Sequence, residues 1–244
     1  MSEDNYSAET NSAKGILYLI PSFVGEDNTN VVPQQVKDVV FSLNEFIVEN
    51  AKTARRYLRA IGYKKNFDTE VTLHELDKHA PKQDSNALLK NVLRGTSCGI
   101  ISEAGNPCIA DPGNEIVAAA HRKNFRVVPL VGPSSILLAL IASGFNGQQF
   151  CFNGYLPIHA TERSKKIKQL ESQSNHATQI FMETPFRNQR LLEEILRVCN
   201  NETNLCVACD ITLSTEFIQS MKIADWKKNT PDINKRYCIF LFGK

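Results

Sequence analysis

The stretch from Cys98 to Gly113 constrains the fold more than any other part of the sequence. An apolar run, Cys98 to Ile101, leads into residues 102–113, where two glycines and two prolines exclude regular secondary structure. Helix-like spacing resumes at Asn114. This order predicts a strand, a long shaped loop and a helix. In an open α/β sheet such a loop lies beyond the carboxyl end of its strand, which is where ligands bind.

Short apolar segments alternate with helix-like segments through the first half of the chain. We expect strands at residues 15–20, 45–48, 71–73, 98–101 and 126–130, and helices at residues 33–43, 50–61, 84–95, 114–123 and 134–143. Alternation of this kind predicts an α/β fold with a mostly parallel sheet that is covered by helices on both faces.

The second half repeats the alternation after a loop-like stretch at residues 143–149. We expect strands at residues 149–155, 178–182, 205–209, 212–221 and 237–242, and helices at residues 161–172 and 187–199. The organisation predicted is a flexible tail at 1–14, an N-terminal α/β domain at 15–145 and a C-terminal α/β domain with a mixed sheet at 146–244.

Composition is that of an ordinary globular chain, with 42% hydrophobic residues, 22% charged residues and a formal net charge of +2. Residues 1–14 are polar, which excludes a signal peptide there, and no apolar stretch is long enough to span a membrane. Seven cysteines without a secretory signal favour free thiols in a reducing cytosol over a disulfide framework. We therefore expect a cytoplasmic protein with no membrane partner.

The phosphate-binding motifs of common nucleotide sites are missing. Neither G-x-G-x-x-G nor G-x-x-x-x-G-K-[ST] occurs, so a ligand at the central loop would be held by backbone groups and shape. A second loop, Val128 to Ser135, ends with two serines at the start of a helix. Ser134 there could cap the helix, or could bind an anion or a carboxylate together with Ser135.

Cysteine and histidine spacing predicts no metal site. Cys206 and Cys209 have C-x-x-C spacing, but side chains three residues apart on a strand point to opposite faces. No matching Cys or His pair lies elsewhere in the sequence.

Charged residues offer two kinds of candidate. Two basic runs, at residues 52–59 and 163–168, could contact phosphates or could be ordinary solvated helix faces. Glu103 and Asp111 lie in the central loop, and Glu183 follows a strand of the second half. Any of these carboxylates could orient a hydroxyl group or act as a base, although Asp111 before Pro112 is typical of a turn.

The central motif, Ser102 to Pro107 followed by Ala110 to Gly113, resembles the Ser-Asp-Ala-Gly-Thr-Pro and Ser-Asp-Pro-Gly signature of one family. The same resemblance continues, in order, at residues 15–21, 49–58, 131–135, 142–144, 153–157 and 183–187. That family is the tetrapyrrole methylase superfamily of S-adenosylmethionine-dependent methyltransferases. The resemblance is greatest to those members that methylate a ribose 2′-hydroxyl of small-subunit ribosomal RNA.

The resemblance implies two α/β domains, a homodimer, and S-adenosyl-L-methionine folded into the cleft between the domains. It places this donor against Pro21, Gly105, Asn106, Pro107, Ile109, Ser134, Ser135, Met182 and Ala208.

Three departures from the family pattern concern the substrate rather than the donor. The family's Glu-Asp-Thr-Arg-His segment is here Glu49 to Thr53, its Arg-Glu-Leu-Thr-Lys segment is Cys209 to Leu213, and its Pro-His-Arg histidine is Phe186. The ribosomal RNA enzymes also usually continue beyond the closing strand, whereas this sequence stops at Lys244.

The activity predicted is methylation of a ribose hydroxyl of ribosomal RNA. Glu103 or Glu183 would act as the base, with Glu49 as a third candidate, while Arg55, Arg56 and Arg187 would steer phosphates. Two alternatives stay open, a methyltransferase acting on a small molecule such as a tetrapyrrole, and a non-catalytic RNA-binding protein of the same fold.

Overall fold

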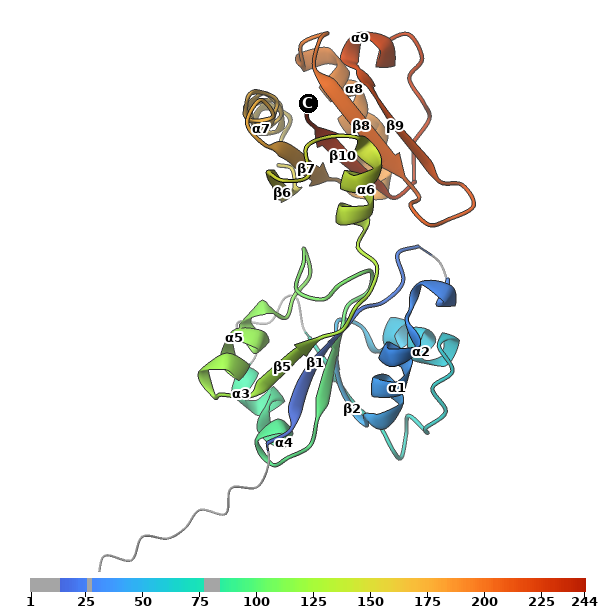
Figure 1. Ribbon diagram of the computed structural model, residues 1–244, viewed down its shortest axis with the longest axis vertical. Helices are drawn as coiled ribbons and strands as arrows, with labels where there is room; N and C mark the ends of the chain where they lie inside the picture. The colour runs from blue at the N-terminus through green and yellow to red at the C-terminus, as the bar shows by residue number, and fades with distance from the viewer. Residues whose placement is uncertain (1–13, 26–27, 77–83) are drawn as a thin grey trace, which may run out of the picture. The chain divides into compact units, whose positions relative to one another are not determined.

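A computed structural model describes residues 14–25, 28–76 and 84–244 of the chain. These residues form two compact α/β units, each built on its own five-stranded sheet (Figure 1). The expected tail, residues 1–14, lies outside the described residues except for Lys14.

The first unit contains a fully parallel sheet, in the order β3-β2-β4-β1-β5. Its strands are β1 (Ile16–Ile20), β2 (Glu45–Val48), β3 (Thr72–Glu75), β4 (Cys98–Ile101) and β5 (Arg126–Pro129). Its helices are α1 (Gln34–Ser42), α2 (Ala51–Ala60), α3 (Ser85–Leu88), α4 (Lys90–Leu93) and α5 (Asn114–Arg122), with a 3₁₀ turn at Thr29–Val31. In Figure 1, α1 and α2 cover one face of this sheet and α3 to α5 cover the other.

The strand order of the first unit determines where its loops meet. β1 lies between the central strand β4 and the edge strand β5, and parallel pairing aligns the carboxyl ends of all three strands. The loops after β1 and β4 are therefore neighbours at one edge. The core below them is apolar, with Leu17, Ile47 and Ile100 each at most 1% exposed.

The second unit contains the mixed sheet β6-β7-β10-β8-β9, in which only β6 and β7 run parallel. Its strands are β6 (Phe150–Tyr155), β7 (Thr178–Met182), β8 (Asn204–Cys209), β9 (Phe217–Lys222) and β10 (Cys238–Phe242). Its helices are α6 (Ser135–Ser143), α7 (Ala160–Gln173), α8 (Asn188–Val198) and α9 (Ile223–Trp226), and a 3₁₀ turn at Pro185–Arg187 precedes α8. The mostly parallel and mixed sheets expected from the sequence are thus confirmed.

Opposite faces of the second sheet carry separate cores. Ala139 and Leu140 of α6 pack with Ala208 on one face. On the other face, residues of α7 and α8 pack around Trp226 of α9, which is 0% exposed and donates a hydrogen bond from its indole to the Leu205 carbonyl at 2.9 Å.

The passage between the units lies earlier in the chain than the expected boundary at residues 145 and 146. It falls at Gly132 and Pro133, because α6 packs on the second sheet and belongs to the second unit. A short early segment also belongs there, since the Thr212 hydroxyl donates a hydrogen bond to the Val24 carbonyl at 2.5 Å.

Two expected elements take a different form. The helix expected at residues 84–95 is two short helices that meet at Leu89. The strand expected at residues 212–221 begins only at Phe217, because Asp210 and Thr212 adopt left-handed backbone angles, with φ of 50° and 74°, in the preceding loop.

Candidate functional site

At the carboxyl edge of the first sheet, the loops after β1 and β4 are joined by their backbones. Ser22 N donates to the Gly105 carbonyl at 2.8 Å, and the Ser102 hydroxyl donates to the same carbonyl at 3.0 Å. Gly105 has a φ of 68°, which a residue with a side chain rarely adopts. The Ser22 hydroxyl is buried and has no hydrogen-bond partner among the described residues, so it is available to a ligand.

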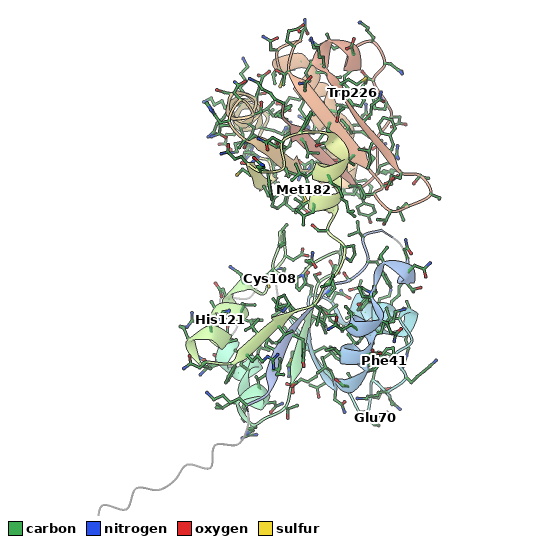
Figure 2. All side chains as sticks on the ribbon, in the orientation of Figure 1. Phe41, Glu70, Cys108, His121, Met182 and Trp226 are labelled. Atoms are coloured by element: carbon green, nitrogen blue, oxygen red, sulfur yellow. The ribbon has the colours of Figure 1, made fainter. Side chains whose placement is uncertain are left out.

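Beyond Gly105 the loop continues through further left-handed positions. Cys108 and Ala110 have φ values of 68° and 61°, and Gly113, the residue before α5, has a φ of 126°. Cys108 lies in the loop region at the end of this unit opposite Glu70 (Figure 2). Left-handed backbone at non-glycine residues is uncommon and gathers at ligand-binding sites.

A third segment, at the end of the first unit, approaches the same edge closely. A Cβ atom added to Gly132 would lie 2.2 Å from the side chain of Pro21 and 3.7 Å from Oδ1 of Asn106. Only glycine fits here, so Pro21, Asn106 and Gly132 form one compact wall. The structure thus brings together the loops that contain Pro21 and Asn106, which were both predicted to bind the donor, and the segment at Gly132.

Helix α2 lies against this edge, next to two of the predicted carboxylates, Glu49 before the helix and Glu103 in the central loop. Glu49 is buried, and its Oε1 accepts a hydrogen bond from Glu103 N at 3.3 Å. Glu103 is exposed, and its Oε1 accepts from the Thr53 hydroxyl of α2 at 3.3 Å. Burial raises the pKa of Tyr57, whose hydroxyl donates to the Pro21 carbonyl at 2.7 Å and therefore stays protonated.

In the second unit, Glu183 directly follows β7 at the end where β8 also finishes. The carboxylate is 4% exposed, and its Oε1 accepts from Thr184 N at 2.7 Å and from the Arg187 guanidinium at 2.5 Å. Its Oε2 is buried and has no hydrogen-bond partner in the described part of the chain. A buried carboxylate oxygen without a donor is costly in a protein alone and indicates a place for a ligand donor.

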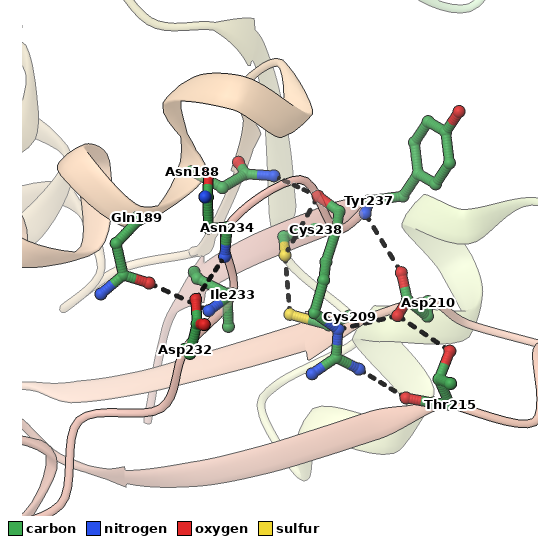
Figure 3. A network of polar contacts seen from close by, with 11 residues as sticks. Asn188, Gln189, Cys209, Asp210, Thr215, Asp232, Ile233, Asn234, Tyr237 and Cys238 are labelled. Atoms are coloured by element: carbon green, nitrogen blue, oxygen red, sulfur yellow. Dashed lines mark hydrogen bonds and ion pairs between the residues drawn. The ribbon is translucent and has the colours of Figure 1, made fainter.

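Asp210 directly follows β8 and accepts hydrogen bonds from three residues at the end of that strand (Figure 3). Its Oδ2 accepts from Arg236 at 2.7 Å and from the Thr215 hydroxyl at 3.0 Å, and its Oδ1 accepts from Tyr237 N at 3.2 Å. Asn188, at the start of α8, is fully buried and donates to the Arg236 carbonyl at 2.6 Å. Neither Asp210 nor Asn188 was among the site residues predicted from the sequence, and an acidic residue directly after a strand was the available signal for Asp210.

The predicted donor residues of the second unit lie on the α6 face of its sheet. Strand pairing aligns Met182 of β7 and Ala208 of β8 on either side of Ile239 in β10. Ala208 is completely buried in that core, whereas Met182 is partly exposed. Ser134 is the cap of α6 and accepts from Leu137 N at 3.4 Å, as the cap interpretation predicts.

The remaining predicted residues are placed as follows. Pro107 is buried and Ile109 is 46% exposed, both in the central loop, and Ser135 is the first residue of α6. Arg55 and Arg56 are exposed on α2. Arg187 is engaged with Glu183, so it does not present a wholly free cation to phosphate.

The cysteines confirm the prediction from strand alternation. Cys206 belongs to the core under α6, and Cys209 belongs to the core on the opposite face. Cys209 instead faces Cys238 of the neighbouring strand, with the two sulfur atoms 2.7 Å apart. Among the described residues, no three His, Cys, Asp or Glu side chains are arranged to bind a metal ion.

A family model described as Tetrapyrrole (Corrin/Porphyrin) Methylases matches residues 34–226, most of both units. The chain belongs to this family. Its relatives include proteins named "Ribosomal RNA small subunit methyltransferase I". The one from Vibrio cholerae serotype O1 is 32% identical over 210 residues, which cover 86% of this chain and 69% of that protein. The one from Escherichia coli O157:H7 is 28% identical over 228 residues, covering 92% and 76%.

Two solved structures share the fold of this family member. The methyltransferase CobJ matches with a TM-score of 0.63 and 16% identity, covering 95% of each chain. Diphthine synthase matches with a TM-score of 0.66 and 13% identity, covering 93% of this chain and 88% of the other. These two likenesses support the fold alone. Among the described residues, no helix combines the length and apolar character needed to cross a membrane.

The family match and the named relatives together show that the chain is an S-adenosylmethionine-dependent methyltransferase. Its residues fit such a donor in two respects. The Ser22 hydroxyl is a buried polar group with no hydrogen-bond partner in the described part of the chain, and a polar group of the donor can pair with it. The left-handed loop from Gly105 to Ala110 also presents backbone in a conformation typical of ligand sites.

Proposed function

We propose that this methyltransferase transfers the methyl group of S-adenosyl-L-methionine to a ribose 2′-hydroxyl of small-subunit ribosomal RNA. The printed names of the relatives from Vibrio cholerae and Escherichia coli support ribosomal RNA as the acceptor. The structural observation that carries the proposal is Oε2 of Glu183, which is buried and has no hydrogen-bond partner among the described residues, because hydroxyl methylation needs an acceptor for the hydroxyl proton.

In this proposal, the donor-binding residues are those that the family resemblance implies. Pro21, Gly105, Asn106, Pro107 and Ile109 would hold the donor from the first unit. The resemblance also assigns Ser134, Ser135, Met182 and Ala208 to donor binding, and Ala208 would contribute backbone because its side chain is buried. The bound donor supplies an electrophilic methyl group on a sulfonium.

Glu183 is the best placed of the three candidate bases. Its Oε2 can accept the 2′-hydroxyl proton as the hydroxyl oxygen forms its bond to the methyl carbon and the carbon–sulfur bond breaks. Arg187 holds the other oxygen at 2.5 Å and so fixes the orientation of the carboxylate. Glu103 is instead exposed, and Glu49 is directed at Glu103 N.

The proposal extends to a cytoplasmic homodimer, as the family resemblance implies. Leu137 and Ile141, one turn apart on α6, are 50% and 76% exposed. The edge strand β6 adds Phe150 and Tyr155, which are 43% and 54% exposed. Exposed apolar side chains on a helix and an unpaired sheet edge are surfaces that a second copy can cover.

The test measures transfer of a labelled methyl group from the donor to isolated small ribosomal subunits, followed by mass mapping of the modified nucleotide. The expected result is one ribose-methylated nucleotide. Donor binding without methylated RNA would contradict the proposal and favour a small-molecule acceptor. Absence of donor binding by calorimetry would favour a non-catalytic protein.

A further inference from the structure

We propose that the outer face of α2 binds the phosphates of the RNA strand that carries the methylated nucleotide. We name Lys52, Arg55, Arg59 and Lys64 the α2 basic surface. The inference rests on the proposed function and adds a binding surface to it.

Helix geometry gathers the three cations of α2 on one side, and Lys64 follows in the loop after the helix. Ala54, Tyr57 and Leu58 are buried against the first unit, which leaves Lys52, Arg55 and Arg59 on the outer side at intervals of three and four residues. At a rise of 1.5 Å per residue, the helix carries them over a distance of about 10 Å, comparable with the reach of a few nucleotides.

An aromatic ring holds the two arginines in place. The guanidinium of Arg59 lies 4.3 Å from the centre of the Phe67 ring, and that of Arg55 lies 5.6 Å from it. Phe67 itself stacks on Tyr63 at 5.9 Å and 19°, and Arg59 donates to the Tyr63 carbonyl at 2.6 Å. Arginines already held in one conformation lose less side-chain freedom when they bind phosphate.

These cations are not neutralised by acidic neighbours. None of the four lies within 4.0 Å of a carboxylate oxygen in the described part of the chain. Glu70, the nearby acid on the turn after Phe67, accepts a hydrogen bond from Asn66 N. A cationic strip without ion-pair partners favours a polyanion, and the proposed substrate is one.

The same helix also touches the reactive edge of the first unit. Thr53 donates to Glu103 in the central loop at 3.3 Å, and Tyr57 donates to the Pro21 carbonyl at 2.7 Å. An RNA strand that follows α2 therefore begins beside the loop proposed to hold the donor. Phosphate contacts along the helix would fix the register of the nucleotide without reading its base.

The basic run of α7 provides a matched control within the chain. Arg163 is buried, 4% exposed, and is paired with Glu194 at 2.5 Å, which removes it from any outer surface. Lys165, Lys166 and Lys168 remain, but no aromatic ring holds them in the described structure, and α7 packs on α8 and β7. We expect these lysines to form an ordinary solvated face.

The experiment compares two triple variants of the full chain. Lys52→Gln/Arg55→Gln/Lys64→Gln removes three charges from the α2 basic surface, and Lys165→Gln/Lys166→Gln/Lys168→Gln removes three from α7. Binding of a small-subunit ribosomal RNA fragment is measured by filter retention at several salt concentrations, donor binding by calorimetry, and folding by thermal unfolding. A third variant, Lys52→Arg/Arg55→Lys/Lys64→Arg, keeps the charge.

The α2 variant is expected to bind RNA about a hundredfold more weakly at ~0.1 M salt, with a salt slope smaller by about 2, because each single-strand phosphate contact contributes about 0.7. Its donor affinity should be unchanged, and the α7 and charge-keeping variants should retain most of the RNA affinity. Equal RNA binding by both triple variants, or equal losses, would overturn the inference. Wild-type protein that binds donor but no RNA would instead overturn the proposed function.

Discussion

The carboxyl-end edges of the two sheets are lined by different kinds of chemical group. In the first unit the edge is mostly backbone, with Ser22 N and the Ser102 hydroxyl both directed at the Gly105 carbonyl. In the second unit the corresponding edge is made of charged side chains, namely the Glu183–Arg187 and Asp210–Arg236 ion pairs. A backbone site tolerates most substitutions except at glycine, whereas a charged site is sensitive even to a conservative exchange.

The difference extends into the bodies of the units. The second unit also contains the buried pair Arg163–Glu194, whereas the pair of Glu45 with His74 in the first unit, at 2.8 Å, has a histidine in place of the arginine. A carboxylate that is paired while buried links stability to pH. The pair Arg163–Glu194 should therefore make the stability of the second unit sensitive to acid.

The largest expected effect is on catalysis, at the charged edge. Glu183→Gln should lower kcat by about 10² to 10⁴-fold, because an amide cannot accept the hydroxyl proton. Donor affinity measured by calorimetry should change little. Glu103→Gln is the control, since that side chain is exposed and lies at the backbone edge. A large loss in the control with none in Glu183→Gln would move the base to the first unit.

The next effect concerns stability of the second unit. Glu194→Gln leaves the buried charge of Arg163 without its anion, which should destabilise this unit by about 3–5 kcal/mol. The single tryptophan, Trp226, is in the core of the same unit, so its fluorescence during urea unfolding reports on that unit. Glu193→Gln, on the exposed neighbour, should change little.

The same glutamate sets an acid dependence whose sign follows from its pKa. Burial alone would raise the pKa of Glu194, but hydrogen bonds from Ser164 and Arg163 and the charges of Arg163 and Arg197 lower it below the ordinary value. Its stabilisation is present above about pH 4.3 and is lost as the pH falls through the lowered value. Glu194→Gln should remove this part of the acid response. An unchanged response would assign it to other carboxylates.

At the backbone edge, Gly132→Ala should destabilise the first unit by about 1–3 kcal/mol and weaken donor binding. The added Cβ would lie 2.2 Å from the rigid ring of Pro21, so the loops must move apart. Gly147→Ala is the matched control, because nothing lies within 4 Å of its added Cβ. Calorimetry with the donor and thermal unfolding measure both consequences, and equal behaviour of the two variants would contradict the close-approach argument.

The smallest effect separates a cap from a ligand contact at the start of α6. Ser134→Ala should lower the stability of the second unit by about 1 kcal/mol, since Leu137 N loses its acceptor. Ser135→Ala should not, because the hydroxyl that caps α6 is that of Ser134. Loss of donor affinity in either variant, seen by calorimetry, would add a ligand role to the structural one.

The sequence predicted most strands because burial of parallel strands leaves clear apolar runs. Glu45–Val48, Cys98–Ile101 and Thr178–Met182 coincide with the expected ranges. The opposite directions of Cys206 and Cys209 also followed from alternation alone and are confirmed by their separate cores. The local sequence pattern was sufficient to predict features that depend on a single strand, such as its range and the directions of its side chains.

Features that depend on partners far apart in the sequence were not predicted. Cys209 meets Cys238 only through the antiparallel register of β8 and β10. Asp210 became recognisable as an organising residue only when Arg236 and Tyr237 were placed around it. Likewise, the local sequence of α6 does not indicate on which sheet the helix packs, since Leu137 and Ile141 are exposed and Leu140 is buried.

The hydrogen bond between Thr212 and the Val24 carbonyl has a consequence for how the protein is made. A ribosome adds residues in order, so the segment at Val24 emerges long before its partner loop exists. A Cβ on the neighbouring Gly25 would lie 2.6 Å from the Leu213 side chain, so this early segment packs closely against the late loop. All strands of the first sheet are therefore synthesised before the segment at Val24 can form its hydrogen bond with Thr212. The second unit can complete its fold only once nearly all of the protein has been synthesised.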